Sequence, residues 1–139
     1  MGMFTTALQP DELLVEIDWP AMPDGAGWSF VEFARRHGDY ALMGVAAWVA
    51  LDGGGACRQA QLVYLNGGDR PVEARQAAAL LRGQALTPEA VDAAAAEAAE
   101  HEIDPMGNVH ASPAFQRHLA RVLTRRALAQ AADRATRIA

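Results

Sequence analysis

The longest apolar run of the chain lies in residues 41–51, where every side chain except that of Gly44 is apolar. Such a run predicts a central strand that is covered on both faces or nearly so. Residues 35–39 precede it and place four ionisable side chains around Gly38. Because glycine adopts a positive φ without steric cost, we expect a sharp turn here that leads into the strand.

Three further segments have strand patterns. Residues 13–19 alternate Leu13, Val15, Ile17 and Trp19 with other side chains, which predicts a strand with one exposed face. Residues 28–34 are expected to form a strand that enters the 35–39 turn. Residues 59–65 follow three successive glycines, a pattern typical of the return strand of a hairpin. These segments predict antiparallel strands joined by short turns.

The second half of the chain changes to a helical period. We predict helices over residues 73–82, 88–101 and 113–135, each bounded by helix start or stop residues. Thr87 and Ser112 are placed as N-caps, and each precedes a proline at the first helical position. Strands followed by helices indicate an α+β fold, with an antiparallel sheet of three to four strands and three helices packed on one face.

Length and charge limit the further possibilities. With 139 residues and 51% hydrophobic content, we expect residues 1–139 to form a single domain with one core. The net charge is −5, and the chain contains no Lys; six of its Arg lie after residue 110, beside a single acid. An acidic body with one arginine-bearing helix argues against a nucleic-acid partner, because docking on nucleic acid needs basic charge gathered on one face.

Cysteine and histidine usage argues against a metal site. Cys57 is the only cysteine, so no internal disulfide or cysteine cluster can form. His101, His110 and His118 are spaced unlike any metal-binding motif. The N-terminus lacks the pattern of a signal peptide, and glycines interrupt every membrane-length apolar stretch. We therefore expect no metal, no membrane contact and a cytoplasmic location.

The 35–39 turn holds the candidate catalytic residues. His37 and Asp39 could act as an acid–base pair, because His titrates near neutrality and a carboxylate can orient it, and Tyr40 follows directly. The alternative is a turn that caps itself and pairs Asp39 with Arg35 or Arg36. A small-molecule groove would form here if Leu14, Trp28 and Phe30 converged on these three residues.

Five pieces of the chain together resemble one family. In order they are FTTALQPDELLVEIDWP, FVEFARRHGDYAL leading into VAAWVAL, LVYLNGGDRPVEAR, LLRGQALTPEAV and NVHASPAFQRHLARVLTRRAL. From about residue 3 to residue 131, the chain resembles the C-terminal domain of the FAD-binding medium subunit of molybdenum hydroxylases, the carbon monoxide dehydrogenase and xanthine dehydrogenase family. Each piece is short, but their order and spacing are specific.

The resemblance implies a domain that covers the flavin ring, while preceding domains hold FAD. It places Leu14, Val31, Gly38 and Asp39 toward the flavin. Val31 stands where xanthine dehydrogenases carry Lys, and Gly38 where they carry Asp. It also implies FAD only within a larger complex, with the FAD-binding domain and iron–sulfur or molybdopterin subunits as partners.

Two alternative functions remain besides the function that the resemblance implies. One is a repurposed stand-alone small-molecule enzyme, with a pocket and a bound ligand beside the turn of residues 35–40. The other is an interaction module that forms a homodimer. For the isolated chain we expect no cofactor, because the glycine-rich segments that bind pyrophosphate belong to the preceding domains.

Overall fold

Four antiparallel strands form one sheet in the computed structural model, which describes residues 6–138. The strands follow one another in space as they do in the chain, in the order β1-β2-β3-β4. They are β1 (Gly27–Ala34), β2 (Ala41–Leu51), β3 (Cys57–Leu65) and β4 (Val72–Glu73). The helical elements follow as α1 (Arg75–Leu81), α2 (Pro88–Glu97), the π-helical turn η1 (Ala98–Glu102) and α3 (Pro113–Ile138). The α+β fold expected from the sequence is therefore confirmed.

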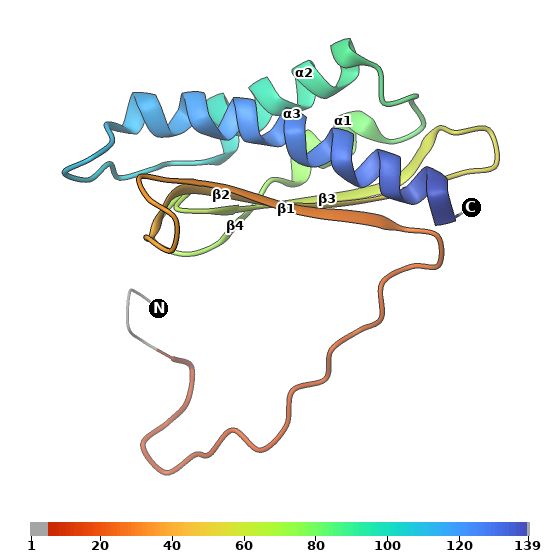
Figure 1. Cartoon of the computed structure of the whole chain (residues 1–139). Helices are drawn as coiled ribbons and strands as arrows, with labels where there is room; N and C mark the ends of the chain where they lie inside the picture. The colour runs from red at the N-terminus through yellow and green to blue at the C-terminus, as the bar shows by residue number, and fades with distance from the viewer. Residues whose placement is uncertain (1–5, 139) are drawn as a thin grey trace.

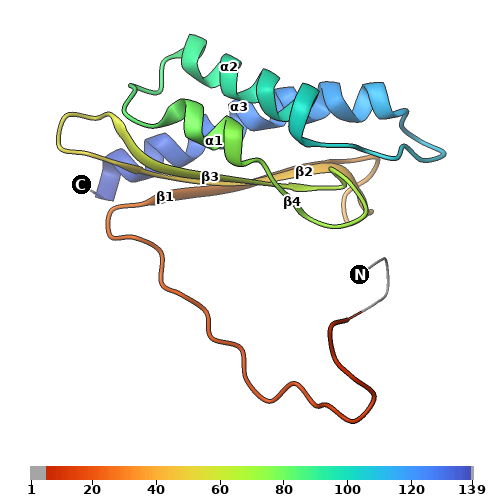
Figure 2. The same ribbon diagram turned by 180° about the vertical axis from the view of Figure 1, so that it is seen from behind.

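All the helices lie on one side of the sheet (Figures 1 and 2). Helix α3 packs across β1 and β2, while α1 packs on β3. Side chains of a strand alternate between its two faces, and on β2 the helix-facing residues Met43, Val45 and Val49 are fully buried. Gly27 allows the closest approach of β1 to α3, because a Cβ atom there would overlap the backbone of Ala131. The core thus lies between the sheet and one helical layer.

Local sequence signals place most elements correctly. The predicted strands 28–34, 41–51 and 59–65 correspond to β1, β2 and β3. The predicted caps are confirmed, since the Thr87 hydroxyl accepts a hydrogen bond from the Ala90 amide at 3.3 Å, and the Ser112 hydroxyl accepts one from the Phe115 amide at 3.2 Å. None of the described helices is both long enough and apolar enough to cross a membrane.

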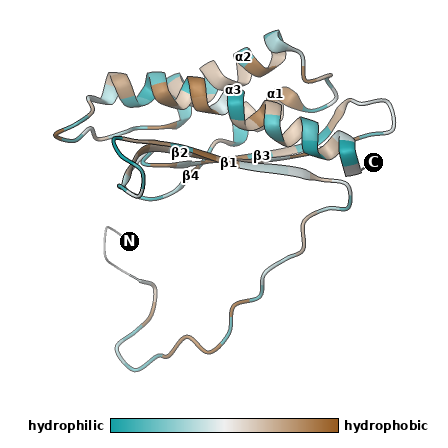
Figure 3. Ribbon diagram, in the orientation of Figure 1, coloured by the Kyte–Doolittle hydropathy of each residue, from teal (hydrophilic) through white to brown (hydrophobic). Residues whose placement is uncertain are grey.

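The strand predicted over residues 13–19 is wrong as a member of this sheet. The segment is not a strand, and its apolar side chains are exposed, Leu13 by 82% and Val15 by 87%. Figure 1 shows it well clear of the sheet, and Figure 3 shows apolar stretches alternating with polar ones along it. Its alternation satisfies the local requirement for a strand, but among the described residues nothing pairs with its backbone.

The boundaries of all three helices differ from the prediction: besides the two differences below, α1 ends at Leu81 instead of residue 82 and α3 ends at Ile138 instead of residue 135. The first helix was expected from residue 73, but Val72 and Glu73 pair with β3 as the short strand β4, so α1 begins at Arg75. The second helix was expected to run to residue 101, but its α-helical part ends at Glu97 and η1 follows. The Ile103 amide there donates to the Ala98 carbonyl at 3.1 Å, five residues back, which is the π-helical spacing.

Candidate functional site

The turn between β1 and β2 is closed by its own backbone. The Asp39 amide donates to the Arg36 carbonyl at 3.1 Å, and Gly38 has φ = 79°. A residue with a Cβ atom is strained at this angle, so the glycine explains how the chain reverses direction between the two strands. The turn lies at one end of the sheet and presents its charged side chains to solvent.

The candidate catalytic residues of this turn lie in a self-capping arrangement. One carboxylate oxygen of Asp39 accepts a hydrogen bond from the Tyr40 amide at 2.9 Å, and the other lies 4.0 Å from Nε of Arg36. His37 is exposed, and Tyr40 is exposed by 94%. Within residues 6–138 no hydrogen bond joins His37 to Asp39. The geometry is that of the self-capping alternative, and an acid–base role for this pair stays a prediction.

A contact that the sequence did not indicate joins this turn to the helical layer. Nη1 of Arg35 lies 2.8 Å from Nε2 of His110. His110 sits in a small loop in which the side chain of Asn108 accepts hydrogen bonds from the His110 and Ala111 amides at 2.8 and 2.9 Å. Because 75 residues separate Arg35 from His110, no local pattern could have revealed the pair.

Three of the four residues expected to face the flavin lie on three different parts of the molecule. Leu14 is 60% exposed on the N-terminal segment that leaves the sheet. Val31 is half-buried on β1 and packs against the core. Gly38 is at the apex of the β1–β2 turn. Neither Val31 nor Gly38 has a charged side chain, so neither can form an ion pair with a cofactor. Only packing against a flavin can be expected of them, and that role stays a prediction.

Aromatic side chains gather on the face of the sheet opposite the helices. Trp28 and Trp48 are directly paired across β1 and β2, and Phe30 is two residues further along β1. Trp19 and Met22 of the N-terminal segment complete a groove of about 330 Å³. His37, Asp39 and Tyr40 do not line this groove, so it is not the groove expected from the sequence. An aromatic surface that belongs to an open sheet face suits contact with a large apolar partner.

A chain of hydrogen bonds runs along the same face. The indole N–H of Trp48 donates to Oε1 of Gln61 at 2.6 Å, and Nε2 of Gln61 donates to Oε1 of Glu73 at 2.9 Å. Nε of Arg75 donates to the other oxygen of Glu73 at 2.8 Å. The hydrogen bond from Gln61, followed by that from Arg75, lowers the pKa of the Glu73 carboxyl. The network fixes the Trp48 ring and satisfies its only polar atom.

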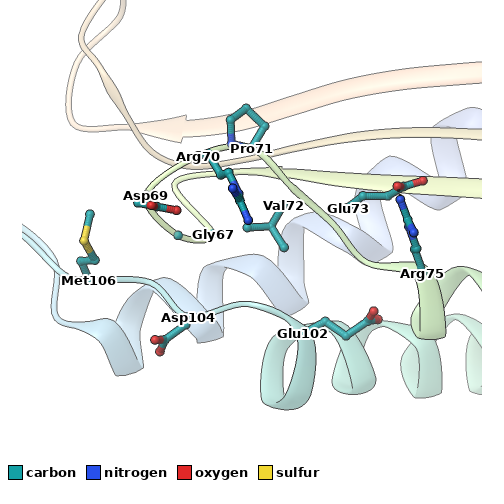
Figure 4. Close-up of a pocket in the computed structure, with 11 residues that line it drawn as sticks. Gly67, Asp69, Arg70, Pro71, Val72, Glu73, Arg75, Glu102, Asp104 and Met106 are labelled. Atoms are coloured by element: carbon teal, nitrogen blue, oxygen red, sulfur yellow. Dashed lines mark hydrogen bonds and ion pairs between the residues drawn. The ribbon is translucent and has the colours of Figure 1, made fainter. Parts of the chain in front are cut away.

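The cleft in Figure 4 lies near the sheet edge and is lined mainly by charged and polar residues. It has a volume of about 500 Å³ and lies between the loop of residues 67–71, strand β4 and the segment 102–106. Four of its charged groups have structural partners. Arg75 pairs with Glu73, Asp104 pairs with Arg117, and both oxygens of Glu102 accept hydrogen bonds from amides in the first turn of α1, at Gln76 and Ala77. Within the described part of the chain, no three acidic, His or Cys side chains form a metal cluster.

Comparison with known proteins identifies the family. A model of the CO dehydrogenase flavoprotein C-terminal domain matches residues 28–131. The chain belongs to this family. The match confirms the resemblance inferred from the sequence motifs, and it covers the whole sheet and most of the helical layer.

Two similar proteins are subunits of dehydrogenases. The alpha subunit of the 6-hydroxypseudooxynicotine dehydrogenase complex of Paenarthrobacter nicotinovorans is 39% identical over 95% of this chain and 44% of that subunit. The carbon monoxide dehydrogenase medium chain of Afipia carboxidovorans is 35% identical over 96% of this chain and 46% of its own length. The chain therefore spans less than half the length of these curated relatives.

Solved structures agree with this assignment. A carbon monoxide dehydrogenase of Hydrogenophaga pseudoflava, which lacks the Mo-pyranopterin moiety of its molybdenum cofactor, superposes with a TM-score of 0.89 at 31% identity, over 96% of this chain and 46% of that one. Quinoline 2-oxidoreductase of Pseudomonas putida superposes with a TM-score of 0.84 at 34% identity, over the same shares of the two chains. Since the family domain matches only from residue 28, this coverage means that the N-terminal segment also has a counterpart in these structures.

Proposed function

We propose that this chain is the flavin-covering C-terminal domain of a molybdenum-hydroxylase flavoprotein. In this proposal FAD is held by the portion that precedes the domain in its relatives, and this domain closes over the flavin ring. One observation carries the proposal: 96% of this chain superposes on a carbon monoxide dehydrogenase chain, and the matched part is only 46% of that dehydrogenase chain. More than half of the relative's chain is thus available to hold the dinucleotide.

The proposal assigns site residues and partners. Leu14 and Gly38 face the flavin, Val31 borders the site through its backbone because its side chain packs against the core, and the Asp39 carboxylate lies at the rim of the flavin site. Iron–sulfur and molybdopterin subunits are the partners of the assembled complex, and the complex is cytoplasmic. The names of the relatives support a multisubunit enzyme, because one is called a medium chain and another a subunit of a dehydrogenase complex.

A chimera tests whether the chain covers flavin. The preceding portion of the 6-hydroxypseudooxynicotine dehydrogenase alpha subunit is joined to residues 1–139, which replace the matching C-terminal part of that subunit. We expect the chimera to retain FAD through gel filtration and to shield the flavin fluorescence from iodide, because the added domain excludes solvent from the ring. The matched control is the same preceding portion without a C-terminal domain. Equal iodide quenching in the two proteins would overturn the proposal.

The isolated chain provides a second test. We expect it to be purified without flavin absorbance, because the segments that would bind the pyrophosphate of FAD belong to the preceding portion. Titration with FAD, followed by flavin fluorescence, should show no saturable binding at micromolar concentration. A micromolar Kd would require about 8 kcal/mol of binding free energy from this domain alone, and would contradict the division of roles.

A further inference from the structure

Two amide side chains hold the β2 end of the turn formed by residues 35–40. Nδ2 of Asn66 donates a hydrogen bond to the Ala41 carbonyl at 2.5 Å, and Nε2 of Gln116 donates one to the Leu42 carbonyl at 3.0 Å. Gln116 belongs to α3 and is only 3% exposed. Carboxamide groups neither gain nor lose a proton near neutral pH, so the protonation state of the domain leaves these two contacts unchanged.

The β1 end of the same turn is held through a histidine. Nη1 of Arg35 lies 2.8 Å from Nε2 of His110 and 3.3 Å from Nδ1 of the same ring. A guanidinium has only N–H donors, so a ring nitrogen of His110 must accept this hydrogen bond. A neutral imidazole has one such nitrogen, whereas an imidazolium has none, because both of its nitrogens carry a proton. The contact therefore requires a neutral His110, and the shorter distance assigns the acceptor to Nε2.

The loop that carries His110 is held in place independently of Arg35. The Asn108 side chain accepts hydrogen bonds from the His110 and Ala111 amides, and the Asn108 amide donates to the Ala111 carbonyl at 2.8 Å. Ala111 is 4% exposed and belongs to the core, and the hydroxyl of the next residue, Ser112, caps α3. When the contact between the two side chains is lost, it is therefore the Arg35 side that gains freedom.

Within residues 6–138, no acidic side chain forms an ion pair with Arg35 or His110. The elements around the contact carry further charged or titratable side chains: Arg36, His37, Asp39 and Tyr40 in the turn, Asp69 and Arg70 in the loop of residues 67–71, Asp104 before His110, and Arg117 and His118 on α3. Of the acids nearest in the chain, Asp39 lies 4.0 Å from Arg36, and Asp104 pairs with Arg117 at 3.0 Å. Protonation of His110 therefore brings together two cations that no carboxylate bridges, and their repulsion opposes the contact.

We infer that His110 is a positioning residue for the flavin site. Through Arg35 it holds the β1 end of the turn while its imidazole is neutral, and it releases this end when the imidazole is protonated. The inference rests on the proposed function, in which Gly38 of the turn faces the flavin. Asn66 and Gln116 keep the β2 end in place in both protonation states, so the turn shifts about that end without unfolding. Shielding of the flavin therefore weakens as the pH falls from about 8 to about 5, the range in which imidazoles titrate.

Arginine side-chain NMR on the full 139-residue chain tests the release of Arg35. The rate of rotation about the Cζ–Nε bond of Arg35 is measured at about pH 8 and at about pH 5. A hydrogen bond from Nη1 hinders this rotation, so we expect the wild-type guanidinium to rotate about two- to fivefold faster at the lower pH. A side chain with a merely structural role would not give this pH dependence. Equal rates at the two pH values would overturn the inference.

Variants of two histidines assign the pH dependence to one ring. In His110→Gln the carboxamide oxygen accepts from Arg35 and does not titrate, so we expect slow rotation at both pH values. In His110→Ala the acceptor is missing, so we expect fast rotation at both. His37→Gln is the matched control, because it removes a second imidazole from the same turn, and it should keep the pH dependence of the wild type. Loss of that dependence in His37→Gln, or its persistence in His110→Gln, would contradict the inference.

The chimera described above connects the contact to the flavin. Iodide quenching of its flavin fluorescence is measured at the same two pH values, beside a chimera that carries His110→Gln and so reports every other effect of pH. We expect quenching at the lower pH to rise about twofold more in the first chimera, a modest change because an exposed contact contributes little free energy. Equal rises in the two chimeras would show that the contact does not position the turn over the flavin, and would overturn the inference. If neither chimera shields the flavin at either pH, the proposed function fails, whereas pH-dependent rotation of Arg35 in the isolated chain would still confirm the release of the turn.

Discussion

Replacing Thr124 by Val tests how the helical layer is fixed to one face of the sheet. The Tyr64 hydroxyl on β3 and the Thr124 hydroxyl on α3 lie 2.6 Å apart, and both side chains are fully buried. The Thr124 hydroxyl also donates to the Ala120 carbonyl at 2.7 Å. Its single proton is therefore used, so Tyr64 must be the donor to Thr124. Burial raises the pKa of Tyr64, which keeps the phenol protonated at neutral pH.

The two single substitutions have unequal costs. Thr124→Val leaves the buried Tyr64 hydroxyl without an acceptor, which costs about 1–3 kcal/mol, and the new methyl group offsets about 0.8 kcal/mol of this. Tyr64→Phe leaves Thr124 bonded to Ala120, so we expect a loss of only about 0.5–1.5 kcal/mol. In the double variant both hydroxyls are gone and no buried polar group is left unpaired. We therefore expect it to be more stable, by about 1 kcal/mol, than the sum of the two losses predicts.

Urea unfolding followed by circular dichroism at pH 7 measures the free energy of unfolding of the wild type, the two single variants and the double variant. The four values can be compared if the free energy falls with urea concentration at the same slope in all four proteins. Trp fluorescence provides a second probe of the same transition. Losses that add to within about 0.3 kcal/mol would refute the reasoning, because additivity would mean that the two hydroxyls do not interact. A larger loss for Tyr64→Phe than for Thr124→Val would refute the assignment of the donor.

Two further predictions concern the Glu residues beside β4. Glu102→Ala should lower the free energy of unfolding by about 1 kcal/mol, because it removes the carboxylate that accepts hydrogen bonds from the Gln76 and Ala77 amides. Glu97→Ala is the control. If thermal unfolding gave the same loss of stability for both variants, the capping role of Glu102 would be contradicted. The lowered pKa of Glu73 means that its contribution to stability is present above the carboxyl's unfolded pKa and is lost as pH falls through the folded value. Titration of wild-type Trp fluorescence should show an acid transition below the ordinary pKa of a glutamate carboxyl, and Glu73→Gln should lack it. If the transition persists in that variant, it belongs to another group.

Local signals in the sequence determined most of the secondary structure. The apolar run of residues 41–51 predicted a strand that is buried along most of its length, and it is β2. Thr87 and Ser112 mark helix starts because a cap depends on side chains and amides two or three residues apart. The glycine of the 35–39 turn identifies the reversal of the chain for the same reason, since positive φ is a property of one residue.

The family was also within reach of the sequence, because the order of five short motifs is carried by the chain itself. The chemistry of the turn was less accessible. His37 and Asp39 are close in sequence, but whether they form a pair depends on the direction of each side chain, and in the structure Asp39 turns to Arg36 and to the Tyr40 amide instead. Proximity along the chain does not determine orientation in a turn.

What only the tertiary structure decided are the pairings between distant residues. Residues 13–19 alternate with the period of a strand. This alternation shows that such a strand would have one apolar side, but it does not show which sheet the strand joins. The segment could therefore be assigned wrongly to the sheet of this domain. Arg35 meets His110 because the end of β1 lies beside the loop that precedes α3. Gln61 joins Trp48 to Glu73 because β3 lies between β2 and β4. The helices could have covered either face of the sheet. They cover the face of Met43, Val45 and Tyr64 because close packing against α3 is available there, and this leaves the tryptophans on the other side.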